Sequence, residues 1–150
     1  MKNTLYIWAL AAALLAAAGC KKTPQPDPIP ACVGEWQLSN IETKSVTYAG
    51  ETVDVYLAFQ EEKAEDGTVT RTFELYQMVG QGRFRKYTGK WDLQENILSG
   101  TYSSKKAWGS TYEMAADENT LTLTAVQSRE VDTYQKTTIP ENLKQEAYEL

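Results

Sequence analysis

The chain contains no histidine among its 150 residues. Without imidazole it lacks the general base of Ser-His and Cys-His hydrolases and a ligand that many zinc sites need. Carboxylate pairs remain at Glu61-Glu62, Glu65-Asp66 and Asp117-Glu118. Two acids can cleave glycosides, but these pairs fall at or beside predicted turns, where acids favour chain reversal and solubility. We therefore predict no catalytic residue, no metal site and no cofactor.

Positive charge is also scarce, because 15 lysines and arginines stand against 20 acids and leave a net charge of −5. Nucleic-acid binding needs clustered positive charge that meets the phosphates. The segment Arg83-Phe84-Arg85-Lys86-Tyr87 interleaves bases and aromatics. This segment lies inside an alternating strand pattern, however, so its bases and aromatics are explained as the solvated and the buried face of one strand. We expect no nucleic-acid partner.

The chain has one long apolar run, and that run is too short to span a membrane comfortably. It extends from Leu5 to Ala18 behind the cation Lys2 and ends in small residues. Its fourteen residues reach about 21 Å as a helix, whereas the hydrocarbon core of a bilayer is about 30 Å thick. The pattern therefore predicts a cleaved signal peptide over residues 1–19.

The segment Ala17-Ala18-Gly19-Cys20 resembles the lipobox of bacterial lipoproteins, with alanine at the position that is usually leucine. The resemblance implies that Cys20 is acylated, and two or three acyl chains at about 0.8 kcal/mol per buried methylene would anchor the protein to a membrane. By the sorting rule of Gram-negative lipoproteins, the lack of an aspartate after Cys20 implies the outer membrane of the cell envelope, with the leaflet left open. An ordinary secretory signal is the alternative, and both place the domain outside the cytoplasm.

Proline is confined almost entirely to the alternating positions 24, 26, 28 and 30. Alternating prolines fix φ and remove hydrogen-bond donors, so we predict that residues 20–31 form the lipidated cysteine and an extended tether. A single domain over residues 32–150 follows, and we expect a monomer. If Cys20 is acylated, Cys32 has no disulfide partner in the chain, so packing must stabilise this domain.

From Trp36 onward the chain alternates apolar and polar residues between frequent turns, which is typical of an all-β domain. The residues expected to share one face are Val53, Val55, Leu57 and Phe59; Val69, Phe73 and Leu75; Tyr87, Gly89, Trp91 and Leu93; Leu98, Gly100 and Tyr102; Tyr112 and Met114; and Leu121, Leu123 and Ala125. About eight strands joined by tight turns predict a small up-and-down antiparallel barrel, because closure removes both exposed edges. Glycines within strands fit sharp bends. A short helix after Pro140 is expected against one end of the barrel.

The motif Gly34-Glu35-Trp36 resembles the G-x-W that opens the first strand of lipocalins and related calycin barrels. The resemblance implies that Trp36 packs across the closed end of the barrel beneath a basic residue of the final strand, a role that we assign to Arg129. The later segments 87–91 and 98–102, with Trp108 and Tyr112, are similar to short lipocalin-like lipoproteins of Gram-negative bacteria. The resemblance covers residues 33 to about 140. The chain is shorter than typical lipocalins and lacks their disulfide.

An aromatic set is the candidate ligand-binding site. Its members are Phe59, Phe73, Tyr87, Trp91, Tyr102, Tyr112 and Met114. Such a lining can hold a small hydrophobic ligand by burial and stacking, but the same side chains can fill an eight-stranded barrel. The first hypothesis is a non-enzymatic, membrane-anchored carrier of a small hydrophobic molecule. The second is a structural lipoprotein that binds another envelope component through loops or outward aromatics such as Tyr56 and Tyr76. An enzyme acting on envelope polymers is the third.

Overall fold

The structure is a computed structural model that describes residues 28–41, 47–48, 51–52 and 54–149. The predicted signal peptide, Cys20, the tether up to residue 27 and Val53 lie outside the described residues. Among the helices of the described part, none combines the length and the apolar character that a membrane crossing requires.

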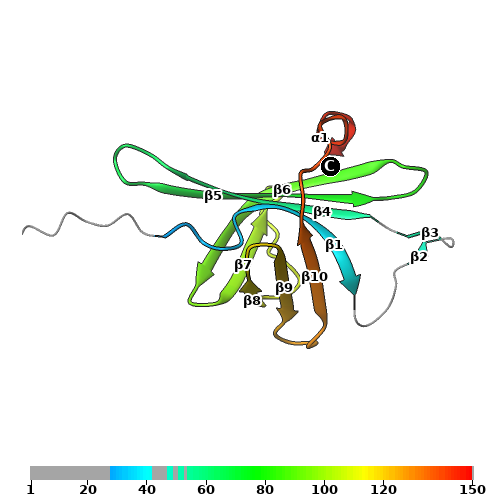
Figure 1. Ribbon diagram of the computed structural model, residues 1–150. Helices are drawn as coiled ribbons and strands as arrows, with labels where there is room; N and C mark the ends of the chain where they lie inside the picture. Colours follow the sequence, from blue (N-terminus) through cyan, green and yellow to red (C-terminus); the bar gives the residue numbers. More distant parts are fainter. Residues whose placement is uncertain (1–27, 42–46, 49–50, 53, 150) are drawn as a thin grey trace, which may run out of the picture.

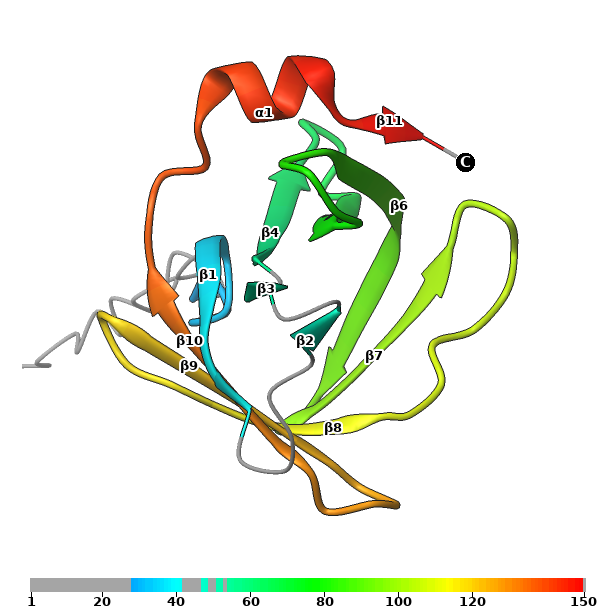
Figure 2. The same ribbon diagram turned by 90° about the vertical axis from the view of Figure 1, so that its right-hand side faces the viewer.

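Eight strands form a closed antiparallel barrel (Figures 1 and 2). They are β1 (Gly34–Ile41), β4 (Val55–Lys63), β5 (Val69–Met78), β6 (Phe84–Gln94), β7 (Ile97–Tyr102), β8 (Tyr112–Ala116), β9 (Thr120–Ala125) and β10 (Val131–Lys136). Each strand pairs with the next along the chain, and β10 returns to pair with β1. The predicted all-β, up-and-down barrel is therefore confirmed. The short strands β2 (Thr47–Tyr48) and β3 (Glu51–Thr52) pair separately.

The predicted alternation places an apolar row of each strand inside the barrel. Val69 is an exception, because it lies at the end of the β4–β5 hairpin and is 43% exposed. Register pairs Leu57 with Leu75 and Phe59 with Phe73, so that successive layers of side chains meet in the interior. The buried core consists of Cys32, Trp36, Leu57, Phe59, Phe73, Trp91, Leu98, Leu121, Leu123 and Tyr134. Full burial of a large apolar side chain contributes about 1.5–3 kcal/mol, so this core is the main source of stability.

Cys32 belongs to this core as a free cysteine. Its side chain is fully buried, and burial raises the pKa of its thiol to about 11. A thiol with so high a pKa is a poor nucleophile at neutral pH, because the thiolate is the reactive form. Cys32 is therefore a packing residue, as expected for a domain stabilised without a disulfide.

Strand β6 is shared between two parts of the barrel wall. Its residues Phe84 to Lys90 pair with β5, whereas Gly89 to Gln94 pair with β7. The first part of β6 would consequently have a free edge. The C-terminal strand β11 (Tyr148–Glu149) lies parallel to Arg85 and Lys86 and covers part of that edge.

Helix α1 (Glu141–Glu146) packs on the outer wall of the barrel, as Figure 2 shows, and the prediction that it lies against one end was wrong. The reason is a second apolar cluster on the outward face of β4 and β5. Ala58 and Tyr76 point outward there, are 2% and 0% exposed, and pack against Ile139 and Leu143.

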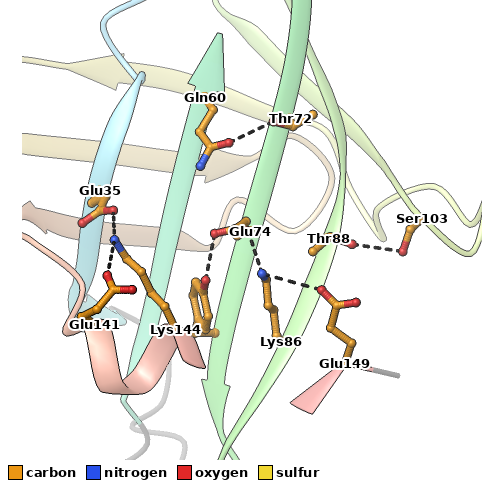
Figure 3. Close-up of polar contacts among 11 residues, drawn as sticks. Glu35, Gln60, Thr72, Glu74, Lys86, Thr88, Ser103, Glu141, Lys144 and Glu149 are labelled. Atoms are coloured by element: carbon orange, nitrogen blue, oxygen red, sulfur yellow. Dashed lines mark hydrogen bonds and ion pairs between the residues drawn. The ribbon is translucent and has the colours of Figure 1, made fainter. Parts of the chain in front are cut away.

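Polar contacts fasten the helix to the wall (Figure 3). Lys144 lies 2.7 Å from a carboxylate oxygen of Glu35, and the other oxygen of Glu35 accepts a hydrogen bond from the backbone N–H of Ile139 at 2.6 Å. Tyr76 donates from its hydroxyl to Glu74 at 2.8 Å. Because the helix covers Tyr76, this aromatic is not available to a partner at the surface.

Gly89 is a tight point of the barrel wall, and its replacement by alanine should be costly. A Cβ atom there would lie 2.2 Å from the carbonyl oxygen of Thr101 and 2.7 Å from the ring of Phe73. We expect Gly89→Ala to lower the free energy of unfolding by about 3 kcal/mol, because backbone and a core ring must both shift. The matched control is Gly109→Ala, because a Cβ atom added there would meet no atom within 4 Å apart from its chain neighbours. Urea denaturation of both variants provides the test, and equal midpoints would contradict this account.

Candidate functional site

The closed end of the barrel is built around Trp36. Its indole Nε1 donates a hydrogen bond to the carbonyl oxygen of Cys32 at 2.8 Å, and the ring is fully buried. The ammonium of Lys136 lies 4.9 Å from the centre of the ring, within the range of a cation–π interaction. A side chain at Gly34 would place its Cβ 3.1 Å from the Nζ atom of Lys136. The glycine of the G-x-W motif thus makes room for the lysine that covers the tryptophan.

The assignment of Arg129 to this covering role was wrong. Arg129 lies in the turn before β10 with a positive φ of 61°, and it pairs with Glu113 at 2.8 Å. Trp36 lies opposite Lys136 in the register of β1 and β10, at the other end of β10 from Arg129. Strand β10 begins at Val131, two residues after Arg129. Arg129 therefore lies outside the strand that supplies the covering residue.

Trp108 fills the middle of the barrel from the connection between β7 and β8. Its ring centre lies 5.0 Å from that of Phe73, 6.1 Å from that of Tyr112 and 6.4 Å from that of Phe59. A Cβ atom at Gly100 would lie 2.2 Å from the indole, so this glycine provides the space that Trp108 occupies. The glycine pattern indicated a bend at this position, but the structure shows close packing by a ring.

A cavity of about 100 Å³ remains beside Trp108 in the barrel interior. It is lined by Leu57, Phe59, Phe73, Leu75, Tyr102, Trp108, Gly109, Tyr112, Leu123, Asp132 and Tyr134. For scale, a dry protein cavity of about 150 Å³ binds benzene. The cavity has about two-thirds of that volume, so the interior is largely filled and leaves room for a ligand smaller than benzene unless side chains shift.

A wider recess of about 410 Å³ adjoins this cavity, because Leu75 and Tyr102 line both. It is bordered by Gln77, Lys86, Tyr87, Thr88, Ser103, Ser104, Lys106 and Glu149. These residues flank the part of β6 that does not pair with β7. Leu75 and Tyr102 thus form the boundary that the recess and the interior cavity share.

A family model described as a lipocalin-like domain matches residues 33–123. The chain belongs to this lipocalin-like family. The match begins one residue before the G-x-W motif and continues into β9, so it includes most of the barrel. The resemblance seen in the sequence is confirmed at the level of the family. Among curated proteins, none is significantly similar to this chain.

The lipocalin-like domain brings most of the seven aromatic-set residues to one region. Phe59, Phe73, Tyr102 and Tyr112 line the interior cavity, and Tyr87 lines the adjoining recess. Met114 packs against the core without lining either space.

Trp91, the remaining member of the aromatic set, lies outside the cavity of the lipocalin-like domain. Its indole N–H donates to the backbone oxygens of Thr72 at 2.9 Å and Gln60 at 3.1 Å. Arg71 covers its ring at 5.1 Å and pairs with Glu61 at 2.8 Å. These contacts make Trp91 a structural residue of the barrel.

Four residues that line the cavity of the lipocalin-like domain were not predicted from the sequence as binding or inward-facing residues, namely Trp108, Gly109, Asp132 and Tyr134. An inward glycine signals close approach by another group, so Gly100 was the available clue to Trp108. Alternation along β10 was the clue to Asp132 and Tyr134, because these two pair with the inward residues Leu123 and Leu121.

Burial dominates the electrostatics of the cavity. Asp132 is half-buried, and its pKa is raised by burial and then by the negative charge of Glu130. Burial also raises the pKa values of Tyr112 and Tyr134, and the charge of Asp132 contributes to both shifts. The site therefore consists of neutral phenols and apolar walls around one carboxyl group, which is an arrangement for binding.

Proposed function

We propose that this protein is a non-enzymatic lipoprotein, anchored to the outer membrane through Cys20, whose barrel binds a small hydrophobic ligand at its open end. The observation that carries the proposal is the cavity of about 100 Å³ beside Trp108, which is lined mainly by aromatic and aliphatic side chains. The chain belongs to the lipocalin-like family, and an eight-stranded barrel of this kind can hold one small ligand.

Binding at this site rests on desolvation and needs no chemistry. Each square ångström of apolar surface that leaves water contributes about 25 cal/mol, and aromatic neighbours add about 0.5–1.5 kcal/mol per well-oriented ring pair. Trp108 forms one wall of the cavity, and its indole is held in place by packing against Phe73 and Gly100. A ligand of the size of benzene or larger therefore extends into the adjoining recess or displaces Trp108.

Native mass spectrometry of the whole protein, extracted from its own host in mild detergent, tests this function. We expect a reproducible added mass that organic extraction removes, in contrast to covalently attached acyl chains, which remain on the protein. Bare protein across independent preparations would contradict carriage of a ligand.

A second candidate function is a structural lipoprotein that binds another envelope component through its outer surface. The observation that favours it is a groove of about 560 Å³ that Gln60, Thr72, Thr88, Lys90 and Ser103 help to line. Gln60, Thr72, Thr88 and Lys90 alternate with inward residues of β4, β5 and β6 and so face outward, whereas Ser103 follows β7. Cross-linking from this groove in intact cells would reveal a specific partner, whereas a ligand carrier should give none.

The lipid anchor makes a separate prediction. Cys20→Ala should abolish labelling by a palmitate analogue and move the protein from the membrane fraction to the soluble fraction, because the acyl chains supply almost all of the membrane affinity. Cys32→Ala is the matched control, since Cys32 is buried in the domain core. That variant should remain labelled and membrane-bound. A labelled, membrane-bound Cys20→Ala protein would contradict the anchor.

A further inference from the structure

One carboxyl group faces the interior cavity. Asp132 lies opposite Leu123 in the register of β9 and β10, and Leu123 is a buried core residue. Because partners in an antiparallel pair share a face, the side chain of Asp132 also points into the barrel. It lines the cavity together with Tyr112, Tyr134 and Trp108.

This carboxylate has no positive complement in the described part of the chain. Burial and then the negative charge of Glu130 raise the pKa of Asp132. Among the described residues, no cation or hydrogen-bond donor offsets these two effects. The titratable groups coupled to it across the interior are the phenols of Tyr112 and Tyr134. A half-buried carboxylate without a partner is costly, and pairing with a cation or a hydrogen-bond donor offsets that cost.

We infer that the ligand of this cavity is a small amine with an apolar or aromatic body, whose ammonium group pairs with the carboxylate of Asp132. The inference rests on the proposed ligand-binding function and adds the chemical class of the ligand. The body would pack against Trp108 and the aliphatic wall, where burial contributes affinity. The ring faces of Tyr112 and Tyr134 add to the attraction, since aromatic faces favour cations.

Other ligand classes fit this charge arrangement less well. The carboxylate of a fatty acid would be repelled by Asp132 at close range. A neutral hydrocarbon would bury Asp132 further without pairing it. A divalent cation needs several oxygen or nitrogen ligands, and the described residues contain no group of three that could hold one.

The test compares two probes of nearly equal size, benzylamine and benzyl alcohol, by calorimetric titration of the whole acylated protein in detergent at pH 7. We expect benzylamine to bind about tenfold more tightly than benzyl alcohol, as a charge-assisted hydrogen bond provides. In Asp132→Asn this preference should disappear. In the control Glu130→Gln, which removes a neighbouring exposed acid, it should persist.

The outcomes separate this inference from the function on which it rests. If both probes bind with equal affinity to the parent protein and to Asp132→Asn, ligand binding stands and the amine inference is overturned. If neither probe binds to the parent protein, both are overturned.

A stability measurement tests whether Asp132→Asn is folded and supplies a second readout. The folded-state pKa of Asp132 is raised, so its ionised form is disfavoured in the folded protein and costs stability above that pKa. Asp132→Asn should therefore be at least as stable as the parent at pH 7. The difference should shrink as the pH falls through the folded pKa and the carboxyl group becomes protonated. A variant clearly less stable than the parent at pH 7 would indicate a structural role and overturn the assignment.

Discussion

Replacing Trp36 with alanine is expected to lower the free energy of unfolding by about 3–5 kcal/mol, one of the two largest losses that we predict. Trp36 is 0% exposed and belongs to the main core cluster. The substitution leaves a cavity at the closed end and removes the hydrogen bond to the carbonyl oxygen of Cys32. It also leaves the ammonium of Lys136 without the ring on which it lies. Urea denaturation followed by circular dichroism measures the loss.

Two controls separate these contributions. Gln37→Ala changes the next residue of β1, which faces away from the barrel interior, and should alter stability by no more than about 0.5 kcal/mol. Lys136→Met retains an unbranched apolar chain but removes the ammonium above the ring, so its cost should fall between the other two. A Trp36→Ala variant as stable as Gln37→Ala would contradict the central role of the closed end.

Replacing Trp108 with alanine should have two linked effects. The free energy of unfolding should fall by about 3 kcal/mol, because the indole packs against Phe59, Phe73 and Tyr112. The interior cavity should also become larger and accept a bigger apolar ligand. Such a ligand at 100 times its dissociation constant should restore about 2.7 kcal/mol. Thermal unfolding with and without benzene or toluene measures both effects.

Trp108→Phe is the matched variant for this prediction. Its ring can still occupy the space that Gly100 leaves, so the loss of stability should be smaller and the gain from added ligand should be slight. If added benzene stabilises the parent protein, Trp108→Phe and Trp108→Ala equally, Trp108 does not limit the size of the cavity.

The fold was predictable because alternation has a direct structural meaning. A strand places successive side chains on opposite faces, so the apolar rows containing Leu57 and Phe59, or Leu121 and Leu123, had to point into a common core. Tight turns between such strands left few topologies other than a meander. The G-x-W motif added the position of the closed end, where Trp36 lies.

The errors arose where a single strand pattern carries too little information. The assignment of Arg129 failed because the covering residue is set by the register between β1 and β10, which places Lys136 opposite Trp36 and which the pattern of one strand does not contain. The position of α1 depended on Ala58 and Tyr76, which face outward and pack against the helix segment. The sequence alone does not indicate that a helix covers these two outward residues. Trp108 belongs to an irregular connection, where no periodicity indicates direction.

The most direct test of the ligand-binding cavity follows the indole N–H signals of the protein by NMR while benzyl alcohol is added. Trp36, Trp91 and Trp108 are the tryptophans of the described residues, and only Trp108 lines the interior cavity. Trp36 and Trp91 donate to backbone oxygens elsewhere in the barrel and serve as internal references. We expect the Trp108 signal to shift in a saturable manner while the other two stay in place. A Trp108 signal that does not move at saturating probe would contradict the account.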